Sequence, residues 1–533
     1  MACVAALRFL PRIRLWHWPL ALIAFATAAC LLDAKQTTTL SLFNAVPWPD
    51  GILKLSRSLL DWDGDGYASL LGSSDCAPWN SSIYPGAREI PDNGIDENCV
   101  MGDAKRKPAR YEALPIPSKP APFDVVLVTI DAFSPSHLGL YDPVRYGPNG
   151  RGTTPNLDRW AQQATVFERA YSSGGWTSIA VPSLFRGVYA RRLQWVRYYE
   201  TNLSALLRKP LETQLRAGEG PLHLFPLSFA DPHPTLAEML RRRGMYCIAV
   251  TDDGYGSMLQ RGTGVERGFD VFRQVDELPP EQRNDAGTAD LALHVLNSAP
   301  RDRRMFAWVH FFGTHWPDEH HDGVRTYGQS NTPLDAFDHE VAYLDTQVIR
   351  VLDALAQRPT PTAVIVASDH GEGLTLVTRT HGLTLDEEVI RIPMLARIPG
   401  WPARRISQVV GSIDLVPTIL ALTETPGPRY LDGMDLAPFV HGAPNKTRTL
   451  ITDTWRLALD DKVEIDLSAV FDGSRKYILD NLTGELHFVR QHRETDPAQP
   501  ADKSQLVGVG PRDPLSSAVY TYVEETGEML LSD

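Results

Sequence analysis

The sequence predicts an α/β protein built on a largely parallel sheet. From residue 123 onward, apolar strand-like runs alternate with helix-like segments, which is the pattern of βαβ units. Two of these runs, DVVLVTI and TAVIVAS, are rich in β-branched residues, and acidic side chains follow them at Asp131 and Asp369. Because parallel sheets bind ligands outside the carboxyl ends of their strands, we expect these two carboxylates to be neighbours.

Helix signals separate the expected strands. Residues 235–244 read as a short helix that Gly244 closes before the apolar strand MYCIAV. The longest amphipathic helix is expected over residues 337–357, where apolar side chains recur at helical spacing. We interpret the acidic face of that helix, including Asp345, as solvated rather than catalytic.

The pattern changes after residue 445. Residues 463–490 read as an antiparallel meander, with turns predicted at Asp472-Gly473 and at residues 481–484. We therefore expect a small C-terminal subdomain, residues 446–533, packed beside a catalytic domain that spans residues 123–445.

Composition and charge exclude some classes of function. The 533 residues are 43% hydrophobic and 22% charged, as in ordinary globular proteins, and they can bury a large core. The formal net charge is −13. Nucleic-acid binding needs a basic face to contact phosphates, so we expect no nucleic-acid partner.

Residues 1–32 predict a signal peptide or a membrane anchor. Arg8, Arg12 and Arg14 precede an apolar stretch whose length is near the lower limit for crossing a bilayer. Small residues before Cys30 would also allow lipidation, so cleavage, lipidation and retention in the membrane all stay open. We expect an exported protein, periplasmic or at the cell surface, that the N-terminus could attach to a membrane.

Residues 59–103 form a short acidic segment. The run DWDGDGY places carboxylates at alternate positions, Asp61, Asp63 and Asp65, with a glycine at the sixth position, which suits a hard cation. An EF-hand would need Glu at the twelfth position of the loop. Gly72 stands there instead, so the segment is not an EF-hand.

The same segment resembles the calcium-binding repeats of secreted bacterial surface proteins. The match covers DWDGDGY, then Asp75-Cys76, then PGAREIPDNGIDENC, which ends at Cys99. The resemblance implies a disulfide between Cys76 and Cys99, which would substitute for a missing core. A solvated acidic loop is the alternative. The calcium ligands that the resemblance implies are Asp61, Asp63, Asp65 and Asp75.

A second resemblance runs from about residue 123 to the C-terminus. Nine segments occur in the order seen in sulfatase-like hydrolases of the alkaline phosphatase superfamily: VTIDAFSPSHLGLYD, TTPNLDRWAQQATVFERAYSS, WTSIAVPSLFRGVY, HFFGTHWP, SDHGEGL, HG, IPMLARIPG, SIDLVPTIL and LDGMDLAPFV. The resemblance implies a three-layer α/β/α fold of the alkaline phosphatase type with a mostly parallel sheet. It also implies a hydrolase of sulfuric or phosphoric esters.

Position by position, this resemblance assigns a metal site and a nucleophile. Asp131 matches the first metal ligand, and Asp369 with His370 completes the site. Thr177 matches the nucleophile, which also contacts the metal. A divalent cation such as calcium, zinc or manganese would lower the pKa of this hydroxyl, and a helix N-terminus would favour an anion. The alternatives are a plain N-cap role for Thr177 and Ser178 as the nucleophile.

Two histidines are further candidates. His315 in His-Trp-Pro matches the substrate-contacting histidine of the family. His381 in His-Gly matches a histidine near the leaving group, where an imidazole can protonate the departing oxygen. Each could instead be an ordinary polar surface residue. We interpret the neighbouring His320 and His321 as surface residues.

The nucleophile segment departs from the common sulfatases. Those enzymes carry Cys or Ser followed by x-Pro-x-Arg, and they convert the first residue to formylglycine. This chain has Thr177-Ser-Ile-Ala-Val181, and Ala132 stands where they carry a second Asp. A threonine ester cannot collapse to an aldehyde, so water or an acceptor must attack it again. The departure favours phosphate or phosphonate esters over sulfate.

Three functions therefore remain open from the sequence. The first is a hydrolase of an anionic ester on a small molecule, glycan or lipid. The second is a phosphoryl-group transferase of the phosphoethanolamine type. The third is an inactive surface protein that binds calcium.

Overall fold

The computed structural model describes residues 121–197, 223–490 and 505–532, with gaps, and shorter stretches at 60–99 and at residue 119. The predicted leader, residues 1–32, lies outside the described residues. No helix in the described part of the chain is long and apolar enough to cross a membrane. The gaps within the longer ranges are 225, 230, 253–257, 316–318, 328–331, 375–378, 459–462 and 527–530.

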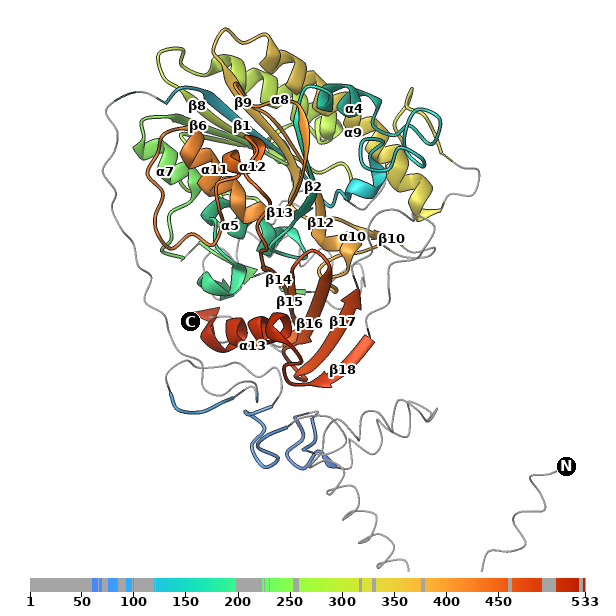
Figure 1. The fold of residues 1–533 in the computed structure, drawn as a ribbon, viewed down its shortest axis with the longest axis vertical. Helices are drawn as coiled ribbons and strands as arrows, with labels where there is room; N and C mark the ends of the chain where they lie inside the picture. The colour runs from blue at the N-terminus through green and yellow to red at the C-terminus, as the bar shows by residue number, and fades with distance from the viewer. Residues whose placement is uncertain are drawn as a thin grey trace, which may run out of the picture.

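An eight-stranded sheet forms the centre of the larger part of the molecule (Figure 1). Its strand order is β13-β2-β12-β9-β1-β8-β6-β7, and only β12 runs antiparallel to its neighbours. The prediction of a mostly parallel sheet is confirmed. The strands are β1 (Asp124–Ile130), β2 (Thr165–Tyr171), β6 (Tyr246–Thr251), β7 (Val271–Gln274), β8 (Met305–Phe311), β9 (Thr362–Ser368), β12 (Arg391–Arg397) and β13 (Arg404–Gly411).

Helices cover both faces of this sheet (Figure 1). Along β1, Val125 and Leu127 join one apolar core, whereas Val126 and Val128 join the other, because successive strand side chains point to opposite faces. The result is the three-layer α/β/α arrangement. One core packs on α5 (Thr177–Arg186), α7 (Leu236–Arg242), α11 (Leu415–Leu422) and α12 (Ala437–Val440), and the other on α4 (Pro155–Ala161), α8 (Asp285–Ser298) and α9 (Pro333–Ala356).

The acidic face of α9 is not solvated, so that prediction is wrong. Asp338, Glu340 and Asp345 are all buried. Asp345 accepts hydrogen bonds from the backbone N–H groups of Asn156 (2.9 Å) and Leu157 (2.8 Å) at the start of α4. It caps a neighbouring helix, and burial raises the pKa of Asp345 to about 6. Periodicity along one helix does not reveal which neighbour covers its polar face.

A separate antiparallel sheet confirms the predicted C-terminal subdomain. Its order is β18-β17-β16-β15-β14-β4, and α13 packs on one face through Leu515 and Val519. The sequence analysis did not predict β14, β18, α13 or the contribution of β4 from the middle of the chain. The elements are β4 (His223–Leu224), β14 (Leu450–Ala458), β15 (Val463–Phe471), β16 (Arg475–Asp480), β17 (Glu485–Arg490), β18 (Gln505–Val509) and α13 (Pro514–Thr526).

The described structure also contains short strands and a short α-helix outside the two large sheets. They form a three-stranded sheet, a two-stranded hairpin and a single helical turn. These elements are β3 (Trp195–Arg197), β5 (Pro226–Leu227) and β19 (Leu531–Ser532), then β10 (Gly373–Leu374) with β11 (Arg379–Thr380), and α10 (Glu387–Ile390).

Strand β14 of the C-terminal sheet reaches two loops of the main domain. The N–H of Gly175 donates to the carbonyl of Asp453 at 3.1 Å, and the N–H of Asp453 donates to Ser173 at 3.2 Å. Thr454 Oγ1 donates to the carbonyl of Gly382 at 2.8 Å. The N–H of Gly382 in turn donates to the carbonyl of Gly175 at 2.8 Å. The C-terminal sheet therefore fixes the loop before α5 against the loop after β11.

Candidate active site

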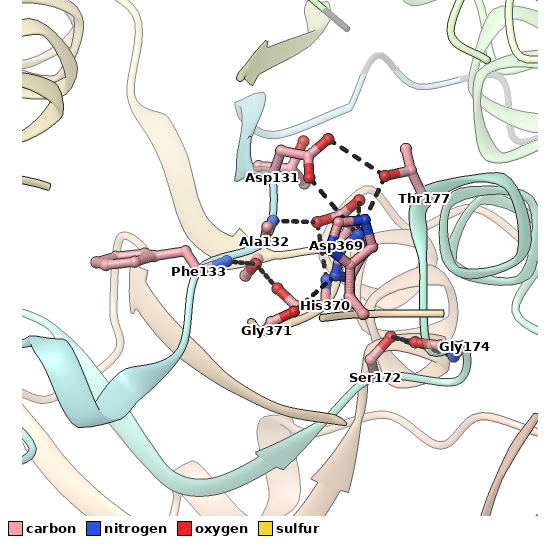
Figure 2. A network of polar contacts seen from close by, with 12 residues as sticks. Asp131, Ala132, Phe133, Ser172, Gly174, Thr177, Asp369, His370 and Gly371 are labelled. Atoms are coloured by element: carbon pink, nitrogen blue, oxygen red, sulfur yellow. Dashed lines mark hydrogen bonds and ion pairs between the residues drawn. The ribbon is translucent and has the colours of Figure 1, made fainter. Parts of the chain in front are cut away.

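The ends of β1 and β9 bring three predicted metal ligands together. These strands pair directly and in parallel, with Ile130 opposite Ser368, so the residues that follow them meet. Asp131, Asp369 and His370 are completely buried, and their ligand atoms all lie within 4.8 Å of one another. Figure 2 shows them facing Thr177.

The backbone at this edge of the sheet is bent. Ala132, directly after Asp131, has a φ of 51°, a left-handed conformation that residues other than Gly, Asn and Asp seldom adopt. Its N–H donates to Asp369 Oδ1 at 3.3 Å. Strained backbone of this kind gathers at functional sites, where the surrounding structure holds it in place.

Thr177 is the first residue of α5 and does not cap the helix. The N-cap residue is Trp176, which makes no side-chain cap. Thr177 Oγ1 lies 3.2 Å from Asp131 Oδ2 and 3.1 Å from His370 Nε2 (Figure 2). Its hydroxyl therefore faces the carboxylate and imidazole groups. An anion bound beside this hydroxyl would meet the positive end of the helix dipole.

Close packing of the preceding loop sets the position of Thr177. A Cβ added at Gly174 would lie 2.7 Å from the backbone nitrogen of Ala180, and one at Gly175 would lie 3.0 Å from the Thr454 side chain. Only glycine allows the loop to approach both α5 and β14 this closely. The two glycines thus let β14 support the start of α5.

The tautomer of His370 follows from its backbone contact. Its Nδ1 lies 2.8 Å from the carbonyl oxygen of Gly371, which can only accept a hydrogen bond, so Nδ1 carries the proton. In the neutral ring Nε2 then has a free electron pair directed at Thr177. An imidazole oriented in this way can bind a metal ion.

The negative charge of this cluster is incompletely compensated. Asp131 Oδ1 and Asp369 Oδ2 are buried, and neither has a hydrogen-bond partner among the described residues. Burial, together with the charge of Asp131, raises the pKa of Asp369. Burial also acts on Asp131, but the surrounding histidines outweigh it and lower the pKa of Asp131. Two buried carboxylates and an imidazole with unused electron pairs fit a divalent metal ion.

The sequence analysis missed His310. It lies on β8 with no exposed surface, and its Nε2 stands 3.5 Å from Asp131 Oδ2. Its Nδ1 lies 2.7 Å from Thr129 Oγ1. Burial lowers the pKa of His310, but Asp131 and Asp369 raise it further than burial lowers it. The sequence carried one signal for His310, which is the only ionisable residue in the apolar run MFAWVHFF.

His315 and His381 continue the site beyond His370. The ring centroids of His370 and His381 lie 4.9 Å apart, as do those of His381 and His315. His381 Nδ1 lies 3.1 Å from Glu372 Oε1. The structure therefore brings both predicted histidines to the same region. The structure also places Glu372 in this region. Glu372 follows His370 by two residues in the sequence, and this nearness was a signal that the sequence analysis did not use.

The prediction of a surface residue is right for His320 and wrong for His321. The His320 side chain is 70% exposed, whereas that of His321 is only 11% exposed. The difference arises because α9 covers His321, whose Nε2 lies 2.8 Å from Glu340 Oε2.

Glu372→Gln is expected to move the alkaline limb of the pH–rate profile to lower pH. Burial would lower the pKa of His381, but the Glu372 carboxylate, followed by Asp131 and Asp369, raises it above 6.5. A protonated His381 would act as general acid, so activity should fall as pH rises through this raised pKa. Without the Glu372 charge the largest upward effect on this pKa is lost, and the fall should begin at a lower pH.

The measurement is kcat/KM of the metal-loaded enzyme between about pH 5 and pH 10, a range that spans ordinary histidine and thiol values. Glu281→Gln, at an exposed position, is the matched control and should leave the limb in place. A limb that stays fixed or moves to higher pH in Glu372→Gln would contradict the role given to this pair.

The acidic N-terminal segment forms a second cluster of carboxylates. Ligand atoms of Asp61, Asp63 and Asp65 lie within 4.8 Å of one another, and a disulfide joins Cys76 and Cys99. Both oxygens of Asp63 are buried without a hydrogen-bond partner among the described residues. The fourth predicted ligand, Asp75, is not part of this group of three. Burial, followed by the charges of neighbouring aspartates that include Asp63, raises the pKa values of Asp65 and Asp75.

Known proteins match most of the folded chain. The sulfatase family profile matches residues 124–425. Inner membrane protein YejM of Salmonella typhi is 23% identical over 349 residues, which cover 63% of this chain and 49% of that protein. N-acetylgalactosamine-6-sulfatase of Sus scrofa is 25% identical over 374 residues, which cover 61% of this chain and 67% of that protein. The chain thus spans about half the length of the first of these relatives.

Solved structures share the fold. Phosphonate monoester hydrolase from Silicibacter pomeroyi has a TM-score of 0.54 at 17% identity, covering 77% of this chain and 97% of that one. A protein of the alkaline phosphatase superfamily from Vibrio parahaemolyticus has a TM-score of 0.51 at 16% identity, covering 76% and 87%. These likenesses confirm the alkaline phosphatase-like fold that the sequence resemblance implied. With a family profile that covers more than half of its length, the chain belongs to the sulfatase family.

Proposed function

We propose that this protein is an exported, metal-dependent hydrolase of phosphate or sulfate esters with Thr177 as its nucleophile. The observation that carries the proposal is the position of Thr177 Oγ1, at the N-terminus of α5 and within 3.2 Å of both Asp131 and His370. The substrate is an anionic ester on a small molecule, glycan or lipid. The threonine favours phosphate or phosphonate chemistry, since formylglycine cannot form here.

Asp131, Asp369 and His370, with Thr177, would hold the divalent metal ion. Calcium, zinc and manganese are the candidates, because the donor set combines hard carboxylates with an imidazole. When bound, the ion would neutralise negative charge on the ester and lower the pKa of the Thr177 hydroxyl. It would also compensate the buried carboxylate oxygens that lack hydrogen-bond partners in the described residues.

The protein groups have distinct parts in the reaction. The Thr177 hydroxyl releases its proton to solvent, and its Oγ1 forms a bond to phosphorus or sulfur while the bond to the leaving oxygen breaks. His381, held protonated by Glu372, donates a proton to that oxygen. His315 contacts the substrate beside His381, and water then attacks the threonine ester to release the product.

The test is a substrate panel. The purified protein is loaded separately with zinc, manganese and calcium and assayed on an aryl sulfate, a phosphate monoester, a phosphodiester and a phosphonate monoester. We expect metal-dependent turnover that a chelator abolishes, with phosphate or phosphonate esters preferred. An absence of turnover on every ester, together with no metal bound at Asp131 and Asp369, would refute the enzyme and leave an inactive calcium-binding protein.

A phosphoryl-group transferase is the second candidate. The threonine ester favours it, since an alcohol acceptor can attack that ester as readily as water. One relative is an inner membrane protein, which is compatible with a lipid or glycan acceptor. Adding a simple alcohol to the assay separates the two candidates, because a transferase yields the transferred ester and a hydrolase yields free phosphate.

We also propose export and the division of the chain into functional parts. The disulfide between Cys76 and Cys99 suits an oxidising compartment. The basic and then apolar character of the first residues suits a leader that is cleaved, lipidated or retained as an anchor, and it supports a periplasmic or surface location. The parts are a leader (1–32), a calcium-binding module (59–103), a catalytic domain (123–445) and a C-terminal subdomain (446–533).

Calcium is expected to protect the N-terminal module from proteolysis. Asp61, Asp63, Asp65 and Asp75 would surround the ion, which would offset their mutual repulsion. Limited proteolysis of the full chain should cut between residues 59 and 103 faster after calcium is removed. The variant Asp63→Asn should be cut at the same rate with and without calcium. Protection of the variant equal to that of the native chain would contradict the calcium site.

A further inference from the structure

A buried network of polar side chains connects the C-terminal helix α13 to the strand that supports the start of α5. All of its side chains are buried. None of them has a part in the reaction proposed above. The network contains Arg191 of the short 3₁₀ helix η4 (Ala190–Arg192), Asp453 of β14, Asp466 and Ser468 of β15, and Tyr522 of α13.

The side chain of Asp453 is the centre of this network. Arg191 Nε donates to Asp453 Oδ1 at 3.2 Å, and Ser468 Oγ donates to the same oxygen at 2.7 Å. Tyr522 Oη donates to Asp453 Oδ2 at 2.8 Å, and Arg191 also pairs with Asp466. Burial raises the pKa of Asp453, although these donors act against the shift. A buried carboxylate depends on such donors, because each one offsets part of its desolvation.

The main chain of Asp453 holds the loop that precedes Thr177. Its carbonyl accepts the N–H of Gly175 at 3.1 Å. The carbonyl of Trp176, the next residue, accepts the N–H of Ala180 at 2.9 Å and so begins the hydrogen bonding of α5. A displacement of Asp453 would therefore move the first turn of α5, which carries Thr177.

The hydroxyl of Tyr522 joins two parts of this arrangement. Besides donating to Asp453, its oxygen accepts the backbone N–H of Arg191 at 3.2 Å. A phenol can donate one hydrogen bond and accept another, so this group connects η4 with β14. Because η4 follows α5 in the chain and β14 holds the loop before it, the hydroxyl joins the segments on both sides of α5.

We propose that Tyr522 positions Thr177 for attack on the ester, acting through Asp453. This inference rests on the proposed function, because it concerns the same nucleophile. Thr177 Oγ1 lies 3.2 Å from Asp131 and 3.1 Å from His370, and the reaction requires that it stay there. Displacing a reacting group by about 1 Å can lower a rate about a hundredfold. Tyr522 is thus a positioning residue, whose effect reaches the ester through the loop before α5.

The test removes single hydroxyl groups from α13 in the full-length, metal-loaded protein. Tyr522→Phe should lower kcat about tenfold or more, with KM unchanged, on the ester that the native protein turns over fastest. Tyr520→Phe is the matched control, because its hydroxyl also makes two hydrogen bonds. Tyr520 Oη accepts the N–H of Gly510 at 2.9 Å and donates to the carbonyl of Gly484 at 3.4 Å, beside β18 and β17. This control should keep the native kcat.

Ser468→Ala tests the same carboxylate from its other oxygen, because Ser468 donates to Asp453 Oδ1. It should also lower kcat with KM unchanged, and it decides the inference if Tyr522→Phe does not fold. A native kcat in the deciding variant would overturn the inference while leaving the proposed hydrolase intact. An equal loss of kcat in Tyr520→Phe would also overturn it, because the effect would then be a general loss of stability.

Failure of the proposed function would look different, because the native protein would then turn over none of the esters. Hydrogen exchange at the Gly175 amide, followed by mass spectrometry, decides the inference in that case. Faster exchange in Tyr522→Phe than in the native protein and in Tyr520→Phe would support the link between α13 and the loop before Thr177. Equal exchange in all three proteins would overturn it.

Discussion

Thr177→Ala is expected to lower kcat by about a thousandfold or more on every ester that the native protein turns over. The change removes the oxygen through which α5 bonds to both Asp131 and His370. No covalent ester can form at an alanine, so the residual rate would come from water. Stability should fall by about 1–3 kcal/mol, because the buried Asp131 Oδ2 loses a donor.

Matched variants separate this role from the alternatives. Thr177→Ser keeps the hydroxyl and should retain measurable turnover. Ser178→Ala tests the alternative nucleophile, whose Oγ is buried without a hydrogen-bond partner among the described residues. Mass spectrometry of the quenched native enzyme should find the transferred group on Thr177. Native-like turnover by Thr177→Ala, or loss of turnover only in Ser178→Ala, would refute the assignment.

Asp369→Asn is expected to abolish metal binding and turnover and yet to stabilise the metal-free protein. The substitution removes one of two adjacent buried carboxylates, and burial, together with the charge of Asp131, raises the pKa of Asp369. The amide oxygen can still accept the N–H groups of Ala132 and His370, which now bond to Oδ1. The gain in the free energy of unfolding should be about 1 kcal/mol, because replacing an uncompensated charge relieves its desolvation.

The opposite result is expected at a buried carboxylate that is already paired. Asp414 holds Arg448 in a two-bond ion pair, with one contact at 2.7 Å. Asp414→Asn should therefore destabilise the protein and leave metal binding intact. Chemical unfolding of metal-free samples and titration with zinc or manganese measure both effects. A loss of metal-free stability in Asp369→Asn would show that the carboxylate is structural rather than a metal ligand.

Much of the fold could be predicted from the sequence, because it depends on local patterns. The runs that became β1 and β9 are apolar and β-branched, and their parallel pairing follows from the class of fold. The capped start and glycine end of α7 could likewise be predicted, since Thr235 and Glu238 form a capping box and Gly244 has a φ of 88°. The strand β14 was missed although its main partner, β15, follows it directly in the chain, whereas its contacts with β4 and with the loop before α5 come from distant segments.

The candidate site likewise contains residues that the sequence could name and residues that it did not reveal. Asp131, Thr177, Asp369 and His370 stand in recognisable segments, so the sequence could name them. His310 and Glu372 were not named, because their local signals do not show that one faces Asp131 and the other His381. The burial of Asp453 was also hidden, because it depends on how β14, β15 and α13 pack together.

The sequence by itself determined the α/β class, the family resemblance and a threonine in place of the formylglycine precursor. These depend on residue type and order, which a single chain displays directly. Only the tertiary structure decided that Thr177 faces Asp131 and His370, that β14 supports the loop before α5, and that Tyr522 of α13 bonds to the same strand. The physical reason is that hydrogen bonding and desolvation depend on neighbours in space, and folding brings those neighbours from segments far apart in the chain.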